Sequence, residues 1–308
     1  MRRRSALALI ALAAAGLGIG LTTDAGQPGA ATYLGSYRWT MDDPAFGGFS
    51  AIDVTADGRQ FITVSDRGHL IEGAFLRDED GRITGITAGP FTQLRDMAGA
   101  PLQGLPSDAE GIAVAPQGGF YVSFEAQHRI RYYPAPDQPA QRVPGHPDFA
   151  GFQINSGLEA LAIDGRGHLF AIPERSGALD RPFPVYRFDQ QGWDIPFRIP
   201  RSGAFLPVGA DIGPDGWLYV LERALTGPGF RSRLRRFDIT GDALNAEEVL
   251  LQTRTARHDN LEGLSVWQDG QGRIRLTMIS DDNFKFFQRT EIVEYAVDAP
   301  LARQPDKE

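Results

Sequence analysis

Three glutamates of this chain stand at the same place in a repeated pattern, at the start of an apolar, β-rich segment. They are Glu110 in AEGIAV, Glu159 in LEALAI and Glu262 in LEGLSV. If equivalent segments converge in the fold, three carboxylates meet, and their repulsion must be offset by a cation or by hydrogen-bond donors. Carboxylate and amide oxygens are the ligands that hard divalent cations prefer. The pattern therefore favours a metal site, with calcium as the leading candidate.

A second series of acidic residues lies where the next β-rich run of each copy ends. Its members are Asp66, Glu125, Glu174, Glu222 and Asp281. Arg67 and Arg223 come directly after two of them, and Asn283 follows two residues after the last. Because antiparallel neighbours run in opposite directions, the end of the second run lies at the same face as the start of the first. We therefore expect the two acidic series to share one site.

Further oxygen donors lie close to these positions in the sequence. They are Asn155, Asp211, Asp259 and Asn260. An alternative role for the three glutamates stays open at this point. Each could accept backbone N–H bonds from the neighbouring copy of the repeat and act as a clasp between the two, since equivalent positions in repeats often share architecture.

The two acidic series belong to a unit that the chain repeats five times: an apolar strand, a Gly/Asp turn and a second β-rich strand. Steps of 60, 49, 49 and 54 residues separate its anchors, which are Ser50, Glu110, Glu159, Val208 and Glu262. A period this long, with only strands inside it, is typical of a β-propeller. First strands line the central channel of a propeller, so the carboxylates are expected at one channel mouth.

Two further strands follow most of these units. A third strand is predicted in all five copies, at 74–80, 129–135, 184–190, 233–239 and 291–297. A fourth is predicted in four copies, at 83–89, 141–145, 193–199 and 247–253. The last copy lacks a fourth strand, and strand 31–40 has no unit of its own, so we expect the termini to close the ring in one shared blade. The fold class is all-β, a single propeller with five visible blades and a possible sixth around residues 90–107.

The chain divides into three parts. We expect a signal peptide and tether at 1–31, the propeller at 32–300 and a disordered tail at 301–308. Arg2, Arg3 and Arg4 precede an apolar run from Ala6 to Leu21, the pattern of a secretory leader cleaved after Ala31. The expected location is periplasmic or secreted, by either the general or the twin-arginine route. An uncleaved membrane anchor is the alternative.

Composition excludes several classes of function. The net charge is -8, and cleavage after Ala31 would remove three Arg and Asp24 and make it -10, which argues against a nucleic-acid partner. The absence of cysteine excludes disulfides, thiolate catalysis and cysteine-bound metals. The chain contains no G-x-S-x-G elbow, P-loop or dinucleotide fingerprint, and its five histidines show no ligand spacing. We expect a monomer that acts on a small anionic substrate and that is not inserted in a membrane after cleavage.

The order and spacing of six short motifs resemble the phytase-like family, also called the esterase-like activity of phytase family. The motifs are Gly47-Gly48-Phe49-Ser50-Ala51-Ile52-Asp53, Ser65-Asp66-Arg67-Gly68, Glu110-Gly111-Ile112 with Glu125, Leu221-Glu222-Arg223, Asn260-Leu261-Glu262-Gly263 and Ser280-Asp281-Asp282-Asn283-Phe284. The resemblance spans about residues 46–297. Ala160 departs from it, because family members more often have glycine after this glutamate.

The resemblance implies an exported propeller that hydrolyses phosphoesters or other esters. Propeller phytases bind phosphate and activate water with calcium ions held by acidic side chains, and Asp42-Asp43-Pro44-Ala45 is similar to their opening. We therefore expect a calcium-dependent hydrolase. A ligand-binding propeller without activity and a lactonase-type calcium propeller are the alternatives.

The expected site has three groups of residues. The metal ligands are Glu110, Glu159, Glu262, Asp66 and Asp281. The catalytic residues are Glu110, Glu159 and Asp281. The residues that bind substrate are Arg67, Arg223 and Asn283.

Overall fold

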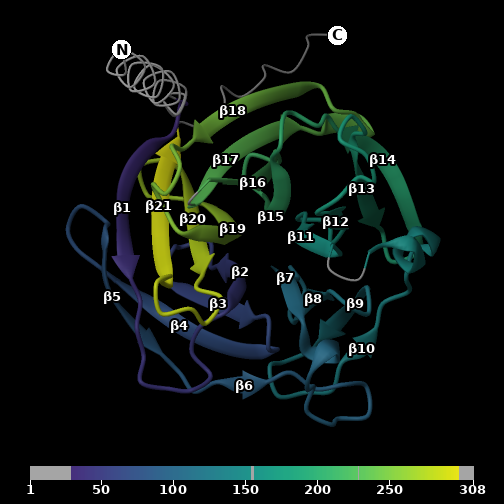
Figure 1. Ribbon diagram of the computed structural model, residues 1–308, viewed down its shortest axis with the longest axis horizontal. Coiled ribbons are helices and arrows are strands. Elements are labelled where there is room, and N and C mark those ends of the chain that lie inside the picture. The colour runs from purple at the N-terminus through teal and green to yellow at the C-terminus, as the bar shows by residue number, and fades with distance from the viewer. Residues whose placement is uncertain (1–28, 154–155, 228, 298–308) are drawn as a thin grey trace, which may run out of the picture.

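The computed structural model describes residues 29–153, 156–227 and 229–297, and they form a ring of five antiparallel sheets, four with four strands and one with a short fifth strand (Figure 1). The innermost strands of the five blades are β2 (Phe49–Val54), β7 (Ala109–Val114), β11 (Leu158–Ile163), β15 (Leu206–Ile212) and β19 (Asn260–Gln268). The second strands are β3 (Gln60–Ser65), β8 (Phe120–Phe124), β12 (Leu169–Pro173), β16 (Leu218–Thr226) and β20 (Ile274–Asp281). The prediction of an all-β propeller is confirmed.

The outer half of each blade also follows the predicted pattern. The third strands are β4 (His69–Arg77), β9 (Arg129–Tyr133), β13 (Phe183–Phe188), β17 (Gly229–Asp238) and β21 (Glu291–Val297). The outermost strands are β5 (Ile83–Ala88), β10 (Gln141–Arg142), β14 (Trp193–Ile199), β18 (Ala246–Gln252) and β1 (Thr32–Arg38). The third strand of the first blade was predicted too late, because β4 begins at His69 and ends at Arg77.

The two ends of the propeller meet in one blade, as predicted. Strand β1 pairs antiparallel with β21, from Thr32 opposite Ala296 to Arg38 opposite Glu291, so the sheet order is β1-β21-β20-β19. Just after β1, the ring of Trp39 stacks on Phe49 of the first blade, with centroids 5.1 Å apart. In the shared blade the strands from the two ends of the propeller pair with each other. The closure therefore removes two strand edges that could promote aggregation.

There is no sixth blade between the first and second repeats. Residues 90–107 contribute only β6 (Thr92–Gln93), which pairs with β4, and the 3-10 turn η1 (Leu105–Ser107). The other short helices of the described chain are η2 (Pro147–Gly151) and η3 (Thr240–Asp242). No helix among the described residues is both long and apolar enough to cross a membrane.

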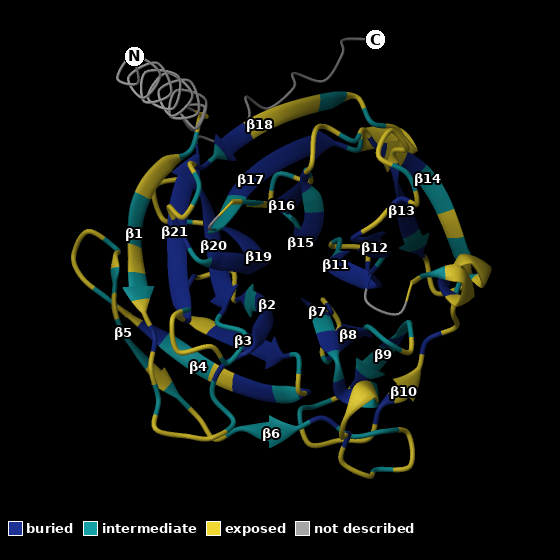
Figure 2. Cartoon of the chain, in the orientation of Figure 1, coloured by how far each residue is buried: buried dark blue, intermediate teal, exposed yellow. Residues whose placement is uncertain are grey.

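The hydrophobic core lies between blades. Five clusters of buried apolar side chains occur, and each is built from two successive blades; one joins Phe170 of the third blade to Leu218 and Phe237 of the fourth. Figure 2 shows the buried inner strands and the exposed loops that connect them. A fully buried large apolar side chain stabilises the fold by about 1.5–3 kcal/mol, so the packing between blades holds the inner strands in place around the channel.

Candidate active site at the channel mouth

A β-bulge occurs at the same place in all five innermost strands. In each pair of first and second strands the register skips one residue near the start of the inner strand. The skipped residues are the five anchors of the sequence repeat: Ser50, Glu110, Glu159, Val208 and Glu262. A bulge changes the direction of a side chain. In three of the strands the bulged residue is a glutamate, so its side chain does not follow the regular two-residue alternation of the strand.

The residue after the bulge lies against the next inner strand. A Cβ at Gly209 would lie 2.4 Å from the carbonyl oxygen of Glu262, and one at Gly263 would lie 2.8 Å from the nitrogen of Ile52. Because the atoms in the way are backbone, a side chain at either position would push two blades apart. Ala160 takes this position in the third blade and is fully buried, so that junction accepts one methyl group.

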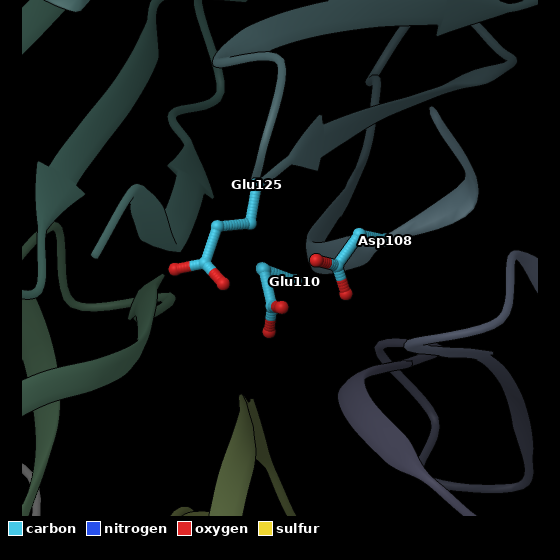
Figure 3. A group of neighbouring side chains, drawn as sticks. All are labelled: Asp108, Glu110 and Glu125. Carbon is cyan, nitrogen blue, oxygen red and sulfur yellow. The ribbon is translucent and has the colours of Figure 1, made fainter. Parts of the chain in front are cut away.

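Three carboxylates converge at the start of the second blade. Asp108 and Glu110 at the beginning of β7 and Glu125 just after β8 each have an oxygen within 4.8 Å of the others (Figure 3). All three are partly exposed. Asp66, after β3, adds a buried Oδ1 that has no hydrogen-bond partner among the described residues. Both acidic series therefore meet at one mouth of the channel here, as the antiparallel pairing requires.

The acidic groups at the mouth make each other costly to ionise. Burial raises the pKa of Glu110 well above its usual value, and the charges of Glu159 and Glu262 raise it further. Burial, then the carboxylates of Glu174 and Glu125, act in the same way on the pKa of Glu159.

The two aspartates at the rim of the mouth, Asp66 and Asp281, also have raised pKa values. The pKa of Asp66 is raised to about 7, chiefly by burial. Burial and the charge of Glu262 raise the pKa of Asp281 to about 8. Full ionisation of these groups would therefore place more negative charge at the mouth than the protein itself compensates.

Arg223 compensates part of this charge. Its guanidinium bonds to the carboxylate of Glu262, donates 2.7 Å to the Oδ1 of Asn260 and lies 3.5 Å from a carboxylate oxygen of Glu174. These carboxylates hold the pKa of Arg223 above its ordinary value, although burial acts against them. The part of the mouth formed by the third, fourth and fifth blades therefore contains a built-in cation.

The part formed by the first and second blades has no such cation. In the described chain, no Lys, Arg or His nitrogen lies within 4.0 Å of a carboxylate oxygen of Asp66, Asp108, Glu110 or Glu125. An orphaned buried oxygen beside three converging carboxylates is the donor set of a hard divalent cation. The residues present therefore fit a calcium ion.

Arg67 lies at the edge of this acidic group. It is exposed, and its guanidinium carbon sits 3.3 Å over the centroid of the Phe284 ring. Asp66, Arg67 and Asp108 line a cavity of about 490 Å³ together with residues 102–105. Such a cavity has room for a small molecule, with one guanidinium on its wall and the acidic cluster beside it.

Clasps between blades exist in the two blades that lack a glutamate at the bulge, three residues beyond Ser50 and Val208. Asp53 accepts a hydrogen bond of 2.9 Å from the backbone N–H of Val114, and Asp211 accepts one of 2.6 Å from Val266. Among the described residues, Glu110, Glu159 and Glu262 accept no backbone N–H from a neighbouring blade. The clasp interpretation is thus wrong for the three glutamates.

Asp211 was expected at the acidic mouth, and that prediction is wrong. It lies three residues into the channel from the bulge, next to Asp53, and the charge of Asp53 together with burial raises its pKa. These two aspartates line a cavity of about 890 Å³ at the opposite end of the channel. Three residues along a strand carry a side chain about 10 Å, which is the reason for the difference.

Glu222 does not join the second acidic series. It is fully buried within the fourth blade, where it accepts hydrogen bonds from Arg233 at 2.7 Å and from Arg235 at 2.8 and 2.5 Å. Successive residues of a strand point to opposite faces. Arg223, the next residue, therefore points into the channel mouth while Glu222 points into the blade.

Three other residues considered in the sequence analysis are Asp259, Asn283 and Asn155. Asp259 accepts bonds from the side chain of Gln288 and the backbone of Arg289, which ties down the loop between β20 and β21. The backbone N–H of Asn283 in that loop donates 2.6 Å to Asp281. Asn155 lies outside the described residues.

Sequence reasoning missed Asp108 as a member of the acidic group. It stands two residues before Glu110, immediately ahead of a strand, in the segment SDAEGI. Residues two positions apart in a strand point to the same side. An acidic residue two positions before Glu110 could therefore have indicated a second carboxylate at this site. Glu125 was predicted to share the mouth with Glu110 as a member of the second series, and the pairing of β7 with β8 brings the two together.

The comparison with family models decides the family. The model described as Phytase-like, esterase-like activity of phytase, matches residues 44–284. The chain belongs to this family. The match begins just before the first bulged strand and ends at the ring of Phe284 below Arg67, so this phytase-like domain contains the whole acidic mouth. A search of curated proteins finds no match.

Solved structures with a similar outline are distant in sequence. A glucose dehydrogenase is 15% identical, with a TM-score of 0.39 and coverage of 82% of each chain. A protein described only provisionally as a gluconolactonase is 14% identical, with a TM-score of 0.40 and coverage of 86% of this chain and 94% of that one. A protein of unknown function from Dyadobacter fermentans is 11% identical, with a TM-score of 0.43 and coverage of 86% and 87%. These similarities are too low to support an activity for the phytase-like chain.

Proposed function

We propose that this phytase-like propeller is an exported, calcium-dependent hydrolase of phosphoesters or related esters. The observation that carries the proposal is the division of the channel mouth into two parts. Arg223 neutralises one part internally, whereas Asp66, Asp108, Glu110 and Glu125 have no protein cation within 4.0 Å among the described residues. A calcium ion held by these four residues would complete the charge balance.

The ion, when bound, would supply positive charge that polarises the ester and lowers the pKa of water. The protein residues then have separate tasks. Arg67 is free at the edge of the cavity to bind an oxyanion of the substrate. Glu159 lies next to the acidic group, and burial, then the charges of Glu174 and Glu125, raise its pKa, so we assign it the role of the acid that protonates a leaving oxygen.

Four of the residues predicted from sequence change role in this proposal, since Glu159 and Glu262 are no longer metal ligands. Arg223 is bound to Glu262, Glu174 and Asn260, so it keeps their charges balanced and does not contact substrate. Asp281 accepts the N–H of Asn283 and lies beside Asn260, which places it on the rim and next to Glu262. We assign it the orientation of water at the mouth.

Calcium titration of the full mature chain tests the proposal. A cation that binds only the folded state adds about 2.7 kcal/mol at a hundred times its dissociation constant. That corresponds to a rise of roughly 5–10 °C in melting temperature for a domain of this size. The change Glu110→Gln should reduce this rise, whereas the control Glu79→Gln, an exposed residue between β4 and β5, should leave it intact.

An activity panel separates hydrolysis from binding. Calcium-loaded protein is incubated with a phosphomonoester, a carboxyl ester and a lactone, and Glu159→Gln is assayed in parallel. Turnover of the first or second that Glu159→Gln lowers by about 10²-fold or more supports the proposal. Turnover of the lactone alone would make the protein a lactonase. A melting temperature that is indifferent to calcium, with no turnover at all, would refute the proposal.

A further inference from the structure

The most exposed large apolar side chains of the described chain gather on one face of the propeller, the face at which the acidic mouth opens. Each of these side chains is at least 68% exposed, and they are Phe286, Leu179, Leu225, Phe287 and Leu105. The next in exposure, Met97, is 54% exposed. A single exposed apolar residue needs no explanation, but a group of them on one face marks an interaction surface.

The direction of the strands places all five side chains on this mouth face. Connections that follow a second strand or lead into a first strand lie there, because neighbouring strands are antiparallel. Leu179 lies between β12 and β13, the two phenylalanines lie between β20 and β21, and Leu105 lies just before β7. Leu225 is the last residue but one of β16. These loops belong to four different blades, so their apolar tips surround the mouth (Figure 1).

Leu225 stands on a hairpin that extends beyond the inner strand of its blade. The inner strand β15 begins at Leu206, which pairs with Arg223. Strands β16 and β17 continue to pair past this point, as far as Thr226 opposite Gly229. Leu225 therefore lies further out than Arg223, and its side chain projects past the charged groups of the mouth.

The loop that carries the two phenylalanines is fixed at its base. Asp282 accepts the backbone N–H of Gly48 from the first blade at 3.0 Å, and Asp259 accepts two hydrogen bonds from the other end of the loop. At the tip, the rings of Phe286 and Phe287 contact each other, with centroids 5.3 Å apart. Their apolar area stays in water until another apolar surface covers it, which makes such a contact favourable.

The exposed charges beside these tips are mainly positive. Among the described residues of the same loops, the exposed charged side chains are one aspartate, Asp180, and four cations, Arg175, Arg181, Lys285 and Arg289. No carboxylate oxygen of the described chain lies within 4.0 Å of Arg181 or Lys285, whereas Arg175 and Arg289 have glutamate partners. Exposed Phe and Leu side chains flanked by Lys and Arg are the combination that binds anionic lipid surfaces.

A lipid surface fits this arrangement better than a protein partner does. A stable protein interface buries a continuous patch of about 800 Å² on each partner. Here the apolar tips stand on separate loops around a polar mouth. Each tip can enter the boundary between headgroups and acyl chains by itself, to a depth of about 5–10 Å.

We propose that the mouth face docks on the surface of an anionic lipid bilayer. In this orientation the five apolar tips lie in the bilayer interface, and the channel mouth faces the headgroups. The docking surface consists of loops outside the acidic cluster, so it does not rest on the proposed hydrolase function.

Vesicle flotation tests the docking surface. The full mature chain is mixed with vesicles of phosphatidylcholine, alone or in equal parts with phosphatidylglycerol, in chelator so that calcium cannot bridge protein and lipid. We expect binding to the mixed vesicles, which Phe286→Ser/Phe287→Ser should weaken by about tenfold or more. Leu179→Ser/Leu225→Ser should also weaken it, because these tips lie on two other blades. Leu76→Ser, an exposed leucine near the end of β4 away from the mouth, is the matched control and should not change it.

Tryptophan fluorescence measures whether the tips enter the bilayer. Phe286→Trp should add emission that shifts to shorter wavelength with mixed vesicles, whereas Leu76→Trp should show no shift. Flotation that is equal for wild type and the phenylalanine double variant, or an unshifted emission, would overturn the inference. A loss confined to the phenylalanine pair would refute the flat orientation, and equal binding to both kinds of vesicle would refute the role of anionic lipid.

Two further outcomes separate this surface from other functions. Self-association that the phenylalanine double variant abolishes, without vesicle binding, would make the face a contact between copies of the chain and overturn the lipid proposal. Neither experiment contains an ester, so vesicle binding without turnover in the activity panel would support the docking surface and refute the hydrolase.

Discussion

The substitution Asp53→Asn should stabilise the protein at neutral and alkaline pH. The carboxylate of Asp53 accepts the backbone N–H of Val114 from the second blade, and asparagine can accept the same bond through its Oδ1. The charge, however, lies inside the channel near a second aspartate, Asp211, whose pKa it raises. The substitution therefore keeps the clasp and removes one of two neighbouring negative charges.

The magnitude follows from the pKa of Asp53, which burial raises from 3.8 to about 6. A folded pKa above the unfolded value means that the wild type loses stability as the pH rises through this range. The difference of about 2.2 pKa units corresponds to an upper limit of about 3 kcal/mol. Because the channel admits solvent, we expect roughly half of this at pH 8, or about 3–5 °C in melting temperature.

Urea and thermal unfolding at pH 4 and pH 8 measure the effect. The gain of Asp53→Asn should be present at pH 8 and absent at pH 4, where the wild-type carboxyl is protonated in the folded state. Asp57→Asn is the control, because hydrogen bonds from Thr55 and Arg59 lower the pKa of this exposed residue and its removal should bring no gain. Equal differences between Asp53→Asn and wild type at the two pH values would refute the electrostatic reasoning.

Three other predictions concern closure, export and a buried ion pair. A chain that starts at Met41 lacks β1, exposes the edge of β21 and should aggregate or melt far below the full propeller; native-like melting would mean that β1 is dispensable. Mass spectrometry of protein from the cell envelope should find an N-terminus near Thr32, whereas intact Met1 in the membrane fraction would support the anchor. Glu222→Gln should cost about 3–5 kcal/mol in urea unfolding, because it leaves the buried Arg233 without a carboxylate partner among the described residues and Arg235 with only the partly exposed Glu247. Glu248→Gln removes an exposed partner of Arg236 and should cost about 1 kcal/mol or less; similar losses in both variants would contradict this difference.

Much of the architecture could be read from residue order alone. The period-2 patterning of the strands and the Gly/Asp turns are local properties of the chain, so the five repeats predicted five blades. The unpaired strand at each end, 31–40 and 291–297, predicted the closing blade, and β1 indeed pairs with β21. The antiparallel order within a blade was sufficient to bring Glu110 and Glu125 to the same mouth. These inferences needed no knowledge of which side chains touch.

The charge balance of the site was decided by tertiary structure. A bulge sends Glu110 into the mouth, whereas the alternation of β16 sends Glu222 into the blade and its neighbour Arg223 into the channel, where it meets Glu262 and Glu174 from other blades. Whether a carboxylate has a cation nearby depends on residues far away in sequence, as Arg223 is 39 residues from Glu262 and 49 from Glu174, because ring closure, not chain order, sets these distances.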